Sequence, residues 1–88
     1  MVAELNGSLM TDREAVHEQL QTQLQLPAYY GRNLDALYDL LTERAEPTEI
    51  LVTGWSELEV NLGGYAAALM DTLYDASREN PALKIQVK

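Results

Sequence analysis

The apolar run Ile50-Leu51-Val52, which ends at Thr53-Gly54, decides the fold of this chain of 88 residues. An uninterrupted apolar run that is bounded by turn-forming residues is typical of a strand buried on both faces of a sheet. Residues 2–5 and 83–87 alternate apolar with polar side chains instead, as strands with one covered face do. We therefore predict that residues 50–52 form a central strand and that the other two segments pair on either side of it.

Amphipathic segments separate these strands and predict helices. Thr11 and Glu14 have the spacing of a capping box, in which the two side chains satisfy free N–H groups at a helix start. The helix that follows is expected to end near Leu26-Pro27. Its apolar residues recur every four positions: Val16, Leu20 and Leu24.

Three more helices are expected further along the chain. Asn33 is placed to cap a second helix that residues 46–48 break, and its apolar stripe comprises Leu34, Leu37, Leu40 and Leu41. Ser56 and Glu59 form another capping-box pattern at the start of a short helix, which Gly63-Gly64 ends. A longer helix follows over residues 65–79, and Asn80-Pro81 stops it.

Strands that alternate with helices indicate an α/β fold with a parallel sheet. We predict a three-stranded parallel sheet in the order 1-2-3, packed by about four helices. The chain has no linker and no internal repeat, so residues 1–88 are expected to form a single domain.

Composition excludes several kinds of function. The chain has 14 acidic and 6 basic residues, and a net charge of −8 disfavours binding to nucleic acids or to anionic membranes. It has no cysteine and one histidine, so we expect no metal site, no cofactor and no enzyme activity. His17 is expected at the surface or along the helix edge. No secretory signal pattern is present at residues 1–4, and we expect a cytoplasmic location.

The acidic residues of the second predicted helix have no simple structural role. Asp35, Asp39 and Glu43 follow one another at intervals of four, and each like-charge pair costs a helix roughly 0.2–0.5 kcal/mol. On a helical projection Thr42 and Glu46 share this face, whereas Arg44 points to the opposite side. Such a face favours a cationic protein partner, although a merely solvated acidic surface remains an alternative.

Tyrosines flank this acidic face in the sequence. Tyr29 and Tyr30 precede the helix and Tyr38 lies within it, and Gly31 permits close approach of another backbone. Tyrosine is a frequent anchor at protein interfaces because it supplies a large contact area at low entropic cost. At least one residue of the Tyr29-Tyr30 pair is expected to pack on the core.

The stretch Leu26-Pro27-Ala28-Tyr29-Tyr30-Gly31-Arg32-Asn33-Leu34-Asp35-Ala36-Leu37-Tyr38-Asp39 resembles the signature of the barstar family, intracellular inhibitors of bacterial ribonucleases. The resemblance extends over essentially the whole chain, including Asn6-Gly7 and His17. It implies the three-stranded fold predicted above, and it implies that the second helix and its preceding loop plug the active site of a cationic, secreted, guanyl-specific ribonuclease in a 1:1 complex.

The resemblance also implies roles for individual residues. Asp39 would occupy the place of an RNA phosphate, Asp35 would accept hydrogen bonds, and Tyr29 would stack on a catalytic histidine. The remaining implied contacts are Gly31, Asn33, Leu34, Tyr38, Thr42, Glu46 and Asp75.

Departures from the family pattern point to a ribonuclease other than barnase as the partner. Tyr38 replaces a family tryptophan, Arg32 stands where an acidic residue is usual, and Glu43-Arg44 replaces a Gly-Trp pair. Two alternatives stay open: an immunity protein against a different toxin, and a general acidic interaction domain.

Overall fold

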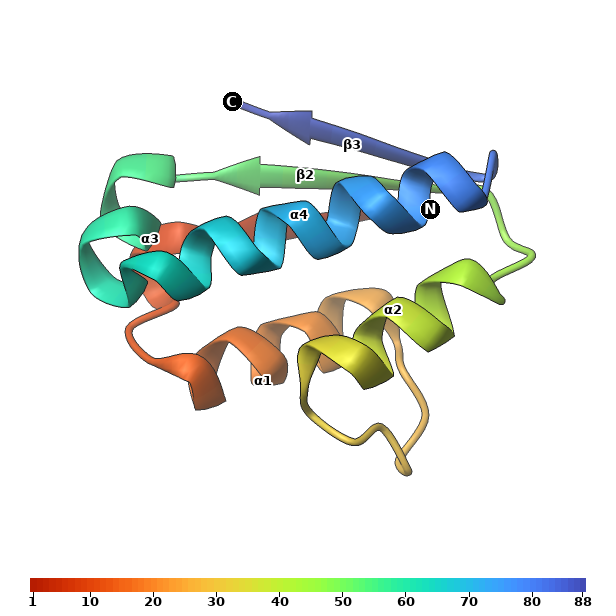
Figure 1. Cartoon of the computed structure of the whole chain (residues 1–88), viewed down its shortest axis with the longest axis horizontal. Helices are drawn as coiled ribbons and strands as arrows, with labels where there is room; N and C mark the ends of the chain where they lie inside the picture. The colour runs from red at the N-terminus through yellow and green to blue at the C-terminus, as the bar shows by residue number, and fades with distance from the viewer.

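Three parallel strands form one sheet in the order β1-β2-β3, in a computed structural model that describes all 88 residues (Figure 1). Ala3 of β1 lies beside Ile50 of β2, and Ile50 lies beside Ile85 of β3. The predicted sheet and its strand order are therefore confirmed. The elements in chain order are β1 (Val2–Asn6), the 3-10 helix η1 (Gly7–Leu9), α1 (Arg13–Leu24), α2 (Leu34–Thr42), β2 (Thr48–Thr53), α3 (Trp55–Leu62), α4 (Gly64–Glu79) and β3 (Leu83–Val87).

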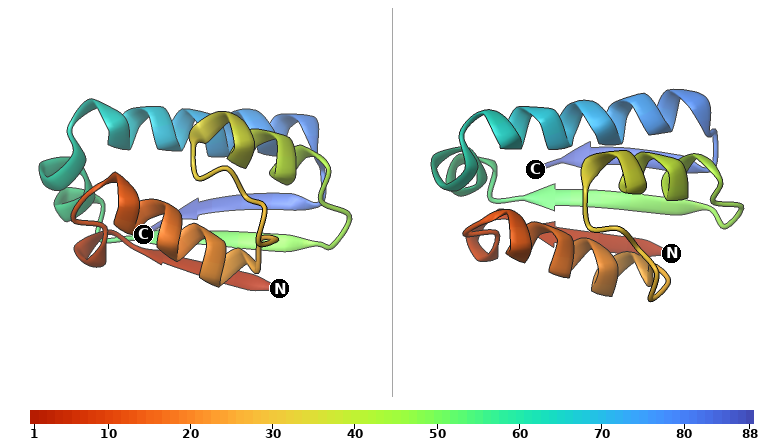
Figure 2. Two further views of the ribbon diagram at one scale, coloured as in Figure 1. Left: turned by 90° about the horizontal axis from the view of Figure 1, so that it is seen from below. Right: turned by 60° about the horizontal axis from the view of Figure 1, so that its bottom comes forward.

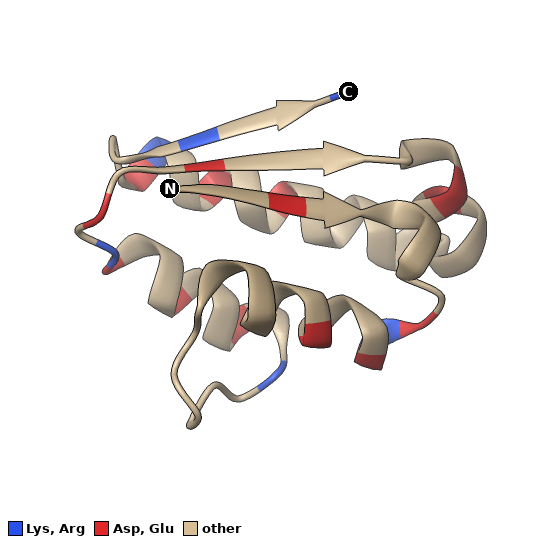
Figure 3. Cartoon of the chain, turned by 180° about the vertical axis from the view of Figure 1, so that it is seen from behind, with Lys and Arg blue, Asp and Glu red and all other residues tan.

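The helices cover only one face of the sheet, so the prediction that the central strand is buried on both faces was wrong (Figure 2). Thr48, Ile50 and Val52 are buried, whereas the residues that alternate with them are only partly covered. Both crossovers of a 1-2-3 parallel sheet run in the same direction, and right-handed crossovers then place their helices on the same side. Figure 3 shows the molecule from the uncovered side.

Two predicted helix caps are shifted from their expected positions. Asp12, not Thr11, caps α1, and its carboxylate accepts a hydrogen bond from the Ala15 N–H at 2.8 Å. The first residue of α3 follows Gly54, whose φ of 66° is left-handed, so Ser56 lies inside the helix and caps nothing. The cap predicted at Asn33 is confirmed, because its side chain accepts a hydrogen bond from the Ala36 N–H at 2.7 Å.

One continuous core joins the covered face of the sheet to α1, α2 and α4. Leu20, Leu37 and Leu73 contribute one fully buried leucine from each of these helices. Leu34 and Leu40 of the predicted α2 stripe are only partly buried, since they flank the buried side of the helix that Leu37 and Leu41 form. The side chains of Trp55 from α3, Met70 and Tyr74 from α4, and Val87 from β3 line an apolar hollow of about 220 Å³.

No helix here combines the length and the apolar character that a bilayer-spanning helix requires.

Candidate protein-binding surface

The outward face of α2 carries two carboxylates without an ion-pairing partner. Asp35 and Asp39 are exposed and take part in none of the three salt bridges of the chain. Leu37 and Leu41 on the opposite side are fully buried, so the helix is held with its acid-bearing face toward solvent. We call Asp35 and Asp39 together the acidic face.

The acidic residues that follow α2 do not extend this row along a helix. The helix ends at Thr42, so Glu43 is its C-cap and Glu46 lies in the loop before β2. The helical projection that placed Glu46 on the acidic face was therefore wrong. Arg44 binds the Glu46 carboxylate at 3.3 Å and also donates to the Leu24 carbonyl at 3.0 Å. Arg44 therefore holds the chain in place where α2 leads into β2.

The loop between α1 and α2 contains two adjacent tyrosines, of which one points to solvent and the other packs on the core. Tyr30 is 5 % exposed and Tyr29 is 80 % exposed, which confirms that one of the pair packs on the core. Together the loop and α2 enclose a small hollow of about 220 Å³, here called the tyrosine hollow. Its lining residues are Tyr29, Tyr30, Gly31, Ala36, Asp39, Leu40 and Glu43.

Several side chains expected at the interface are already used to hold the local structure. Asn33 donates from its amide to the Gly31 carbonyl at 3.2 Å while it caps α2. The Thr42 hydroxyl donates back to the Tyr38 carbonyl at 2.9 Å. Leu34, Tyr38 and Thr42 are half-buried along one flank of α2, so each presents only part of its side chain to a partner.

Asp75 lies on α4, the helix that packs against α2. The Asn80 amide that ends α4 donates to the Leu41 carbonyl at 2.9 Å, which fixes the carboxyl ends of the two helices side by side. Asp75 is exposed and belongs to the row of α4 residues that begins with Tyr65 and continues through Thr72. Its carboxylate is paired with Arg78, unlike those of the acidic face.

His17 is buried, so the prediction of a surface or edge position was wrong. Its side chain is 2 % exposed, and its two ring nitrogens lie 2.5 Å from the Tyr30 hydroxyl and 2.7 Å from the Tyr65 hydroxyl. Tyr65 lies 48 residues away in the chain. No spacing rule in the sequence connects it to His17. We call these three side chains the His17 cluster.

Burial keeps the His17 cluster uncharged. It lowers the pKa of His17, and the nearby Arg32 guanidinium lowers that pKa further. Burial likewise raises the pKa of Tyr30 and of Tyr65. A neutral imidazole donates from one nitrogen and accepts at the other, so both hydroxyls are satisfied and the ring has no free nitrogen for acid–base chemistry.

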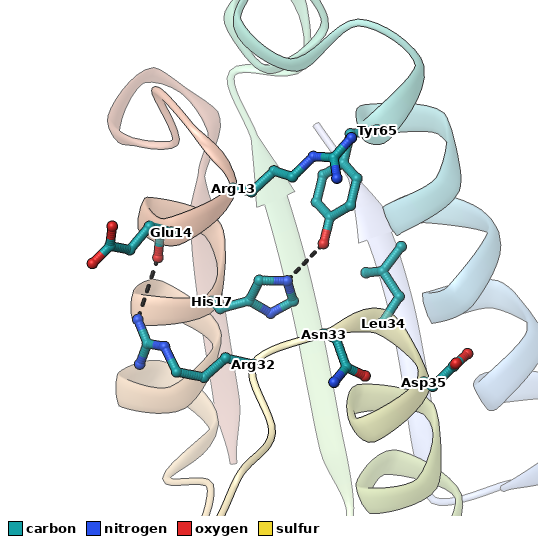
Figure 4. Close-up of a pocket in the computed structure, with 8 residues that line it drawn as sticks. All are labelled: Arg13, Glu14, His17, Arg32, Asn33, Leu34, Asp35 and Tyr65. Carbon is teal, nitrogen blue, oxygen red and sulfur yellow. Dashed lines mark hydrogen bonds between the residues drawn. The ribbon is translucent and has the colours of Figure 1, made fainter.

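A second, more polar hollow of about 480 Å³ adjoins the amino end of α2 (Figure 4). We call it the Arg13 pocket, because the Arg13 guanidinium lies 4.3 Å above the Tyr65 ring at its rim. Arg32, whose φ of 56° is left-handed, lines it but donates to Gln21 at 2.8 Å and to Glu18 at 3.3 Å. The pocket is lined by Arg13, Glu14, His17, Arg32, Asn33, Leu34, Asp35 and Tyr65.

These features define a small α/β protein that presents an acidic helix and an exposed tyrosine. No group of three or more His, Cys, Asp or Glu side chains is placed to hold a metal ion.

The chain belongs to the barstar family: the family model described as "Barstar (barnase inhibitor)" matches residues 1–88. A protein of Bacillus subtilis (strain 168) named "Putative ribonuclease inhibitor YrdF" is 33 % identical over 76 residues, which cover 85 % of this chain and 84 % of that protein. A family of inhibitors agrees with the expectation that the chain is not an enzyme.

Proposed function

We propose that this protein is a ribonuclease inhibitor that binds a secreted, basic, guanyl-specific bacterial ribonuclease in a 1:1 complex. Its place of action would be the cytoplasm, where it protects RNA of the producing cell. The observation that carries the proposal is the acidic face, with two carboxylates left without a partner on a helix whose other side is buried. Membership of the barstar family supports it independently.

The mechanism follows from what an unpaired carboxylate offers to a site built for an anion. A ribonuclease active site holds cationic groups arranged for a phosphate, and the Asp39 carboxylate would accept the same charge-assisted hydrogen bonds. Asp35 would accept hydrogen bonds one turn earlier on the same helix, and Tyr29 would stack against the active site from the loop. Because substrate RNA would then be blocked from the site, no chemistry by the inhibitor is required.

The other expected contacts surround Asp35, Asp39 and Tyr29. Gly31 lines the tyrosine hollow beside Asp39 and would meet the partner there; a Cβ at this position would crowd the Ala36 Cβ of the same chain at 3.2 Å. Leu34, Tyr38 and Thr42 would supply the flank of the contact. Glu46 and Asp75 would act at its edge, where each first has to be released from its arginine or shared with it.

The test is inhibition of RNA cleavage by a panel of purified guanyl-specific bacterial ribonucleases. We expect inhibition of at least one of them, and we expect Asp39→Ala to weaken it. The loss of a hydrogen bond to a charged group costs about 1.5–3 kcal/mol, which is roughly a ten- to hundredfold rise in Kd.

The matched control is Glu4→Gln, which also removes one negative charge but lies on the uncovered side of β1. Glu4→Gln should leave Kd nearly unchanged. If no ribonuclease of the panel is inhibited, the proposal is lost, and a toxin of different chemistry becomes the partner to seek.

A further inference from the structure

We propose that Arg13 is a specificity-determining contact that binds a carboxylate of the inhibited ribonuclease, so that the interface extends from the acidic face across the Arg13 pocket. This inference rests on the proposed function. Arg13 is positively charged, whereas the acidic face that carries the proposed function is negative. The partner surface would therefore present a carboxylate beside its cationic groups.

Arg13 is set apart from the other arginines of the chain by its lack of a carboxylate partner. Arg32, Arg44 and Arg78 each form a salt bridge, whereas Arg13 is exposed and forms none. Glu14 is its chain neighbour, but its carboxylate points away from the pocket (Figure 4). In a chain with more than twice as many acids as bases, an arginine left unpaired is a positive group available to a partner.

The Arg13 guanidinium is held in position although it has no ion pair. It lies over the face of the Tyr65 ring, 4.3 Å from the ring centroid, where the electron density of the ring attracts a cation. The Tyr65 hydroxyl is fixed in turn by the buried His17 at 2.7 Å. This chain of contacts restricts the guanidinium before binding, so a partner loses less side-chain entropy on engaging it.

The position of the pocket connects Arg13 to the proposed interface. Asn33, Leu34 and Asp35 line the Arg13 pocket and also belong to the expected contact surface. A ribonuclease that covers Asp35 would therefore lie beside the pocket. Three other charged residues line the pocket: Glu14, Arg32 and Asp35. The Arg32 side chain is turned toward α1 by Gln21 and Glu18, so Arg13 is the arginine of the pocket with an uncommitted guanidinium.

A carboxylate is the group that this pocket fits best. The planar guanidinium donates paired hydrogen bonds in a fork that matches a carboxylate, and the neutral His17 cluster below adds no competing charge. An arginine at the rim of an acidic surface also disfavours partners that present a cation there, so Arg13 would discriminate among basic ribonucleases.

The sign of a mutational effect tests the inference. Arg13→Gln makes an acidic inhibitor more acidic by one charge, so binding to a uniformly cationic partner would tighten. A local contact with a carboxylate predicts the opposite, a rise in Kd of about tenfold. Arg13→Glu should raise Kd further, because it places two carboxylates together, and Arg13→Lys should recover part of the loss.

The measurement is Kd against whichever purified ribonuclease of the panel the unmodified protein inhibits most strongly. Lys84→Gln is the matched control, since it removes one positive charge from the exposed surface of β3. It should leave Kd unchanged or lower it slightly. If Arg13→Gln behaves like Lys84→Gln, the inference is overturned while the proposed function stands. Absence of inhibition by the unmodified protein would overturn the proposed function itself.

Discussion

At the scale of single residues, His17 connects three segments that are distant in the chain. Its ring lies on α1, and its hydrogen-bond partners come from the loop before α2 and from the first turn of α4. Because Tyr30 is the buried member of the tyrosine pair, the bond to His17 fixes the loop that presents Tyr29. A buried polar group thus helps to shape the surface proposed for binding.

The lowered pKa of His17 predicts a pH dependence of stability. The folded state holds the proton less tightly than the unfolded chain, whose histidine titrates near pH 6.5. The unfolded state therefore binds more protons below about pH 6.5, and the free energy of unfolding should fall as the pH drops below that value, by up to about 1.4 kcal/mol per pH unit. Above it, His17 contributes no pH dependence.

Urea denaturation followed by circular dichroism between pH 5.5 and pH 7.5 measures this effect. Since His17 is the only histidine, His17→Gln should flatten the profile in that interval even if it lowers stability throughout. A slope that persists in His17→Gln would assign the effect to another group.

At the scale of elements, α2 is a short helix that depends on its cap. It has nine residues, its first turn contains Asp35, and Asp35 and Asp39 repel each other one turn apart. Asn33 offsets this by satisfying the Ala36 N–H, and its own amide donates to Gly31. The residue that begins the helix therefore also shapes the loop beside the tyrosine hollow.

Removal of this cap should destabilise the protein measurably. We expect Asn33→Ala to cost about 1 kcal/mol, which lowers the melting temperature by roughly 4–8 °C in a domain of this size. Asn33→Asp keeps an acceptor and should retain most of the stability. Asp12→Ala removes the corresponding cap of α1 and should give a similar shift in thermal denaturation. An unchanged melting temperature for Asn33→Ala would show that the cap contributes nothing.

The elements themselves were predictable because hydrophobic periodicity and turn residues are local signals. The strand order was predicted from a contrast between segments: residues 50–52 are continuously apolar, whereas residues 2–5 and 83–87 alternate apolar with polar side chains. The cap of α1 was missed because Asp12 and Thr11 are both good capping residues, and only the backbone at Asp12 decides between them. The one-sided sheet was missed because three consecutive apolar residues do not reveal whether the second face is covered.

The candidate surface was predictable only in part, because local sequence patterns do not reveal contacts between residues that are distant in the chain. Asp35 and Asp39 stand out because two like charges one turn apart destabilise the helix that carries them. The sequence motif around them is also specific for the barstar family. Arg13 and Tyr65 gave no signal, since their contact joins residues far apart in sequence. The ion pair of Glu46 with Arg44 likewise depends on loop side-chain placement that spacing alone does not determine, whereas Asp75 and Arg78 have the i,i+3 spacing of a helix pair.

At the scale of the whole molecule, the net charge of −8 and the position of the acidic face act together. Long-range attraction speeds the encounter with a basic partner, and the local carboxylates then hold it. Figure 3 shows that acidic residues occur on both the sheet and the helices, so the overall field is not restricted to α2. Steering should therefore depend on the total charge as well as on the face that binds.

Salt should slow association more than it speeds dissociation. The screening length shrinks from about 8 Å at 0.15 M to about 3 Å at 1 M ionic strength, which removes long-range attraction but not direct contacts. Stopped-flow mixing with an inhibited ribonuclease should show an association rate that falls steeply with salt. Asp35→Asn and Glu4→Gln change the net charge equally, and the loss at Asp35 should also raise the dissociation rate. Salt-independent association would contradict electrostatic steering.

The apolar hollow between α3, α4 and β3 gives the protein a built-in optical probe. Trp55 is the only tryptophan, and it lines this hollow together with Met70, Tyr74 and Val87, whereas no residue of α2 lines it. Its fluorescence therefore senses whether α3, α4 and β3 are assembled, and neither residue of the acidic face lines its surroundings. Unfolding can thus be followed in the native sequence, without an introduced label.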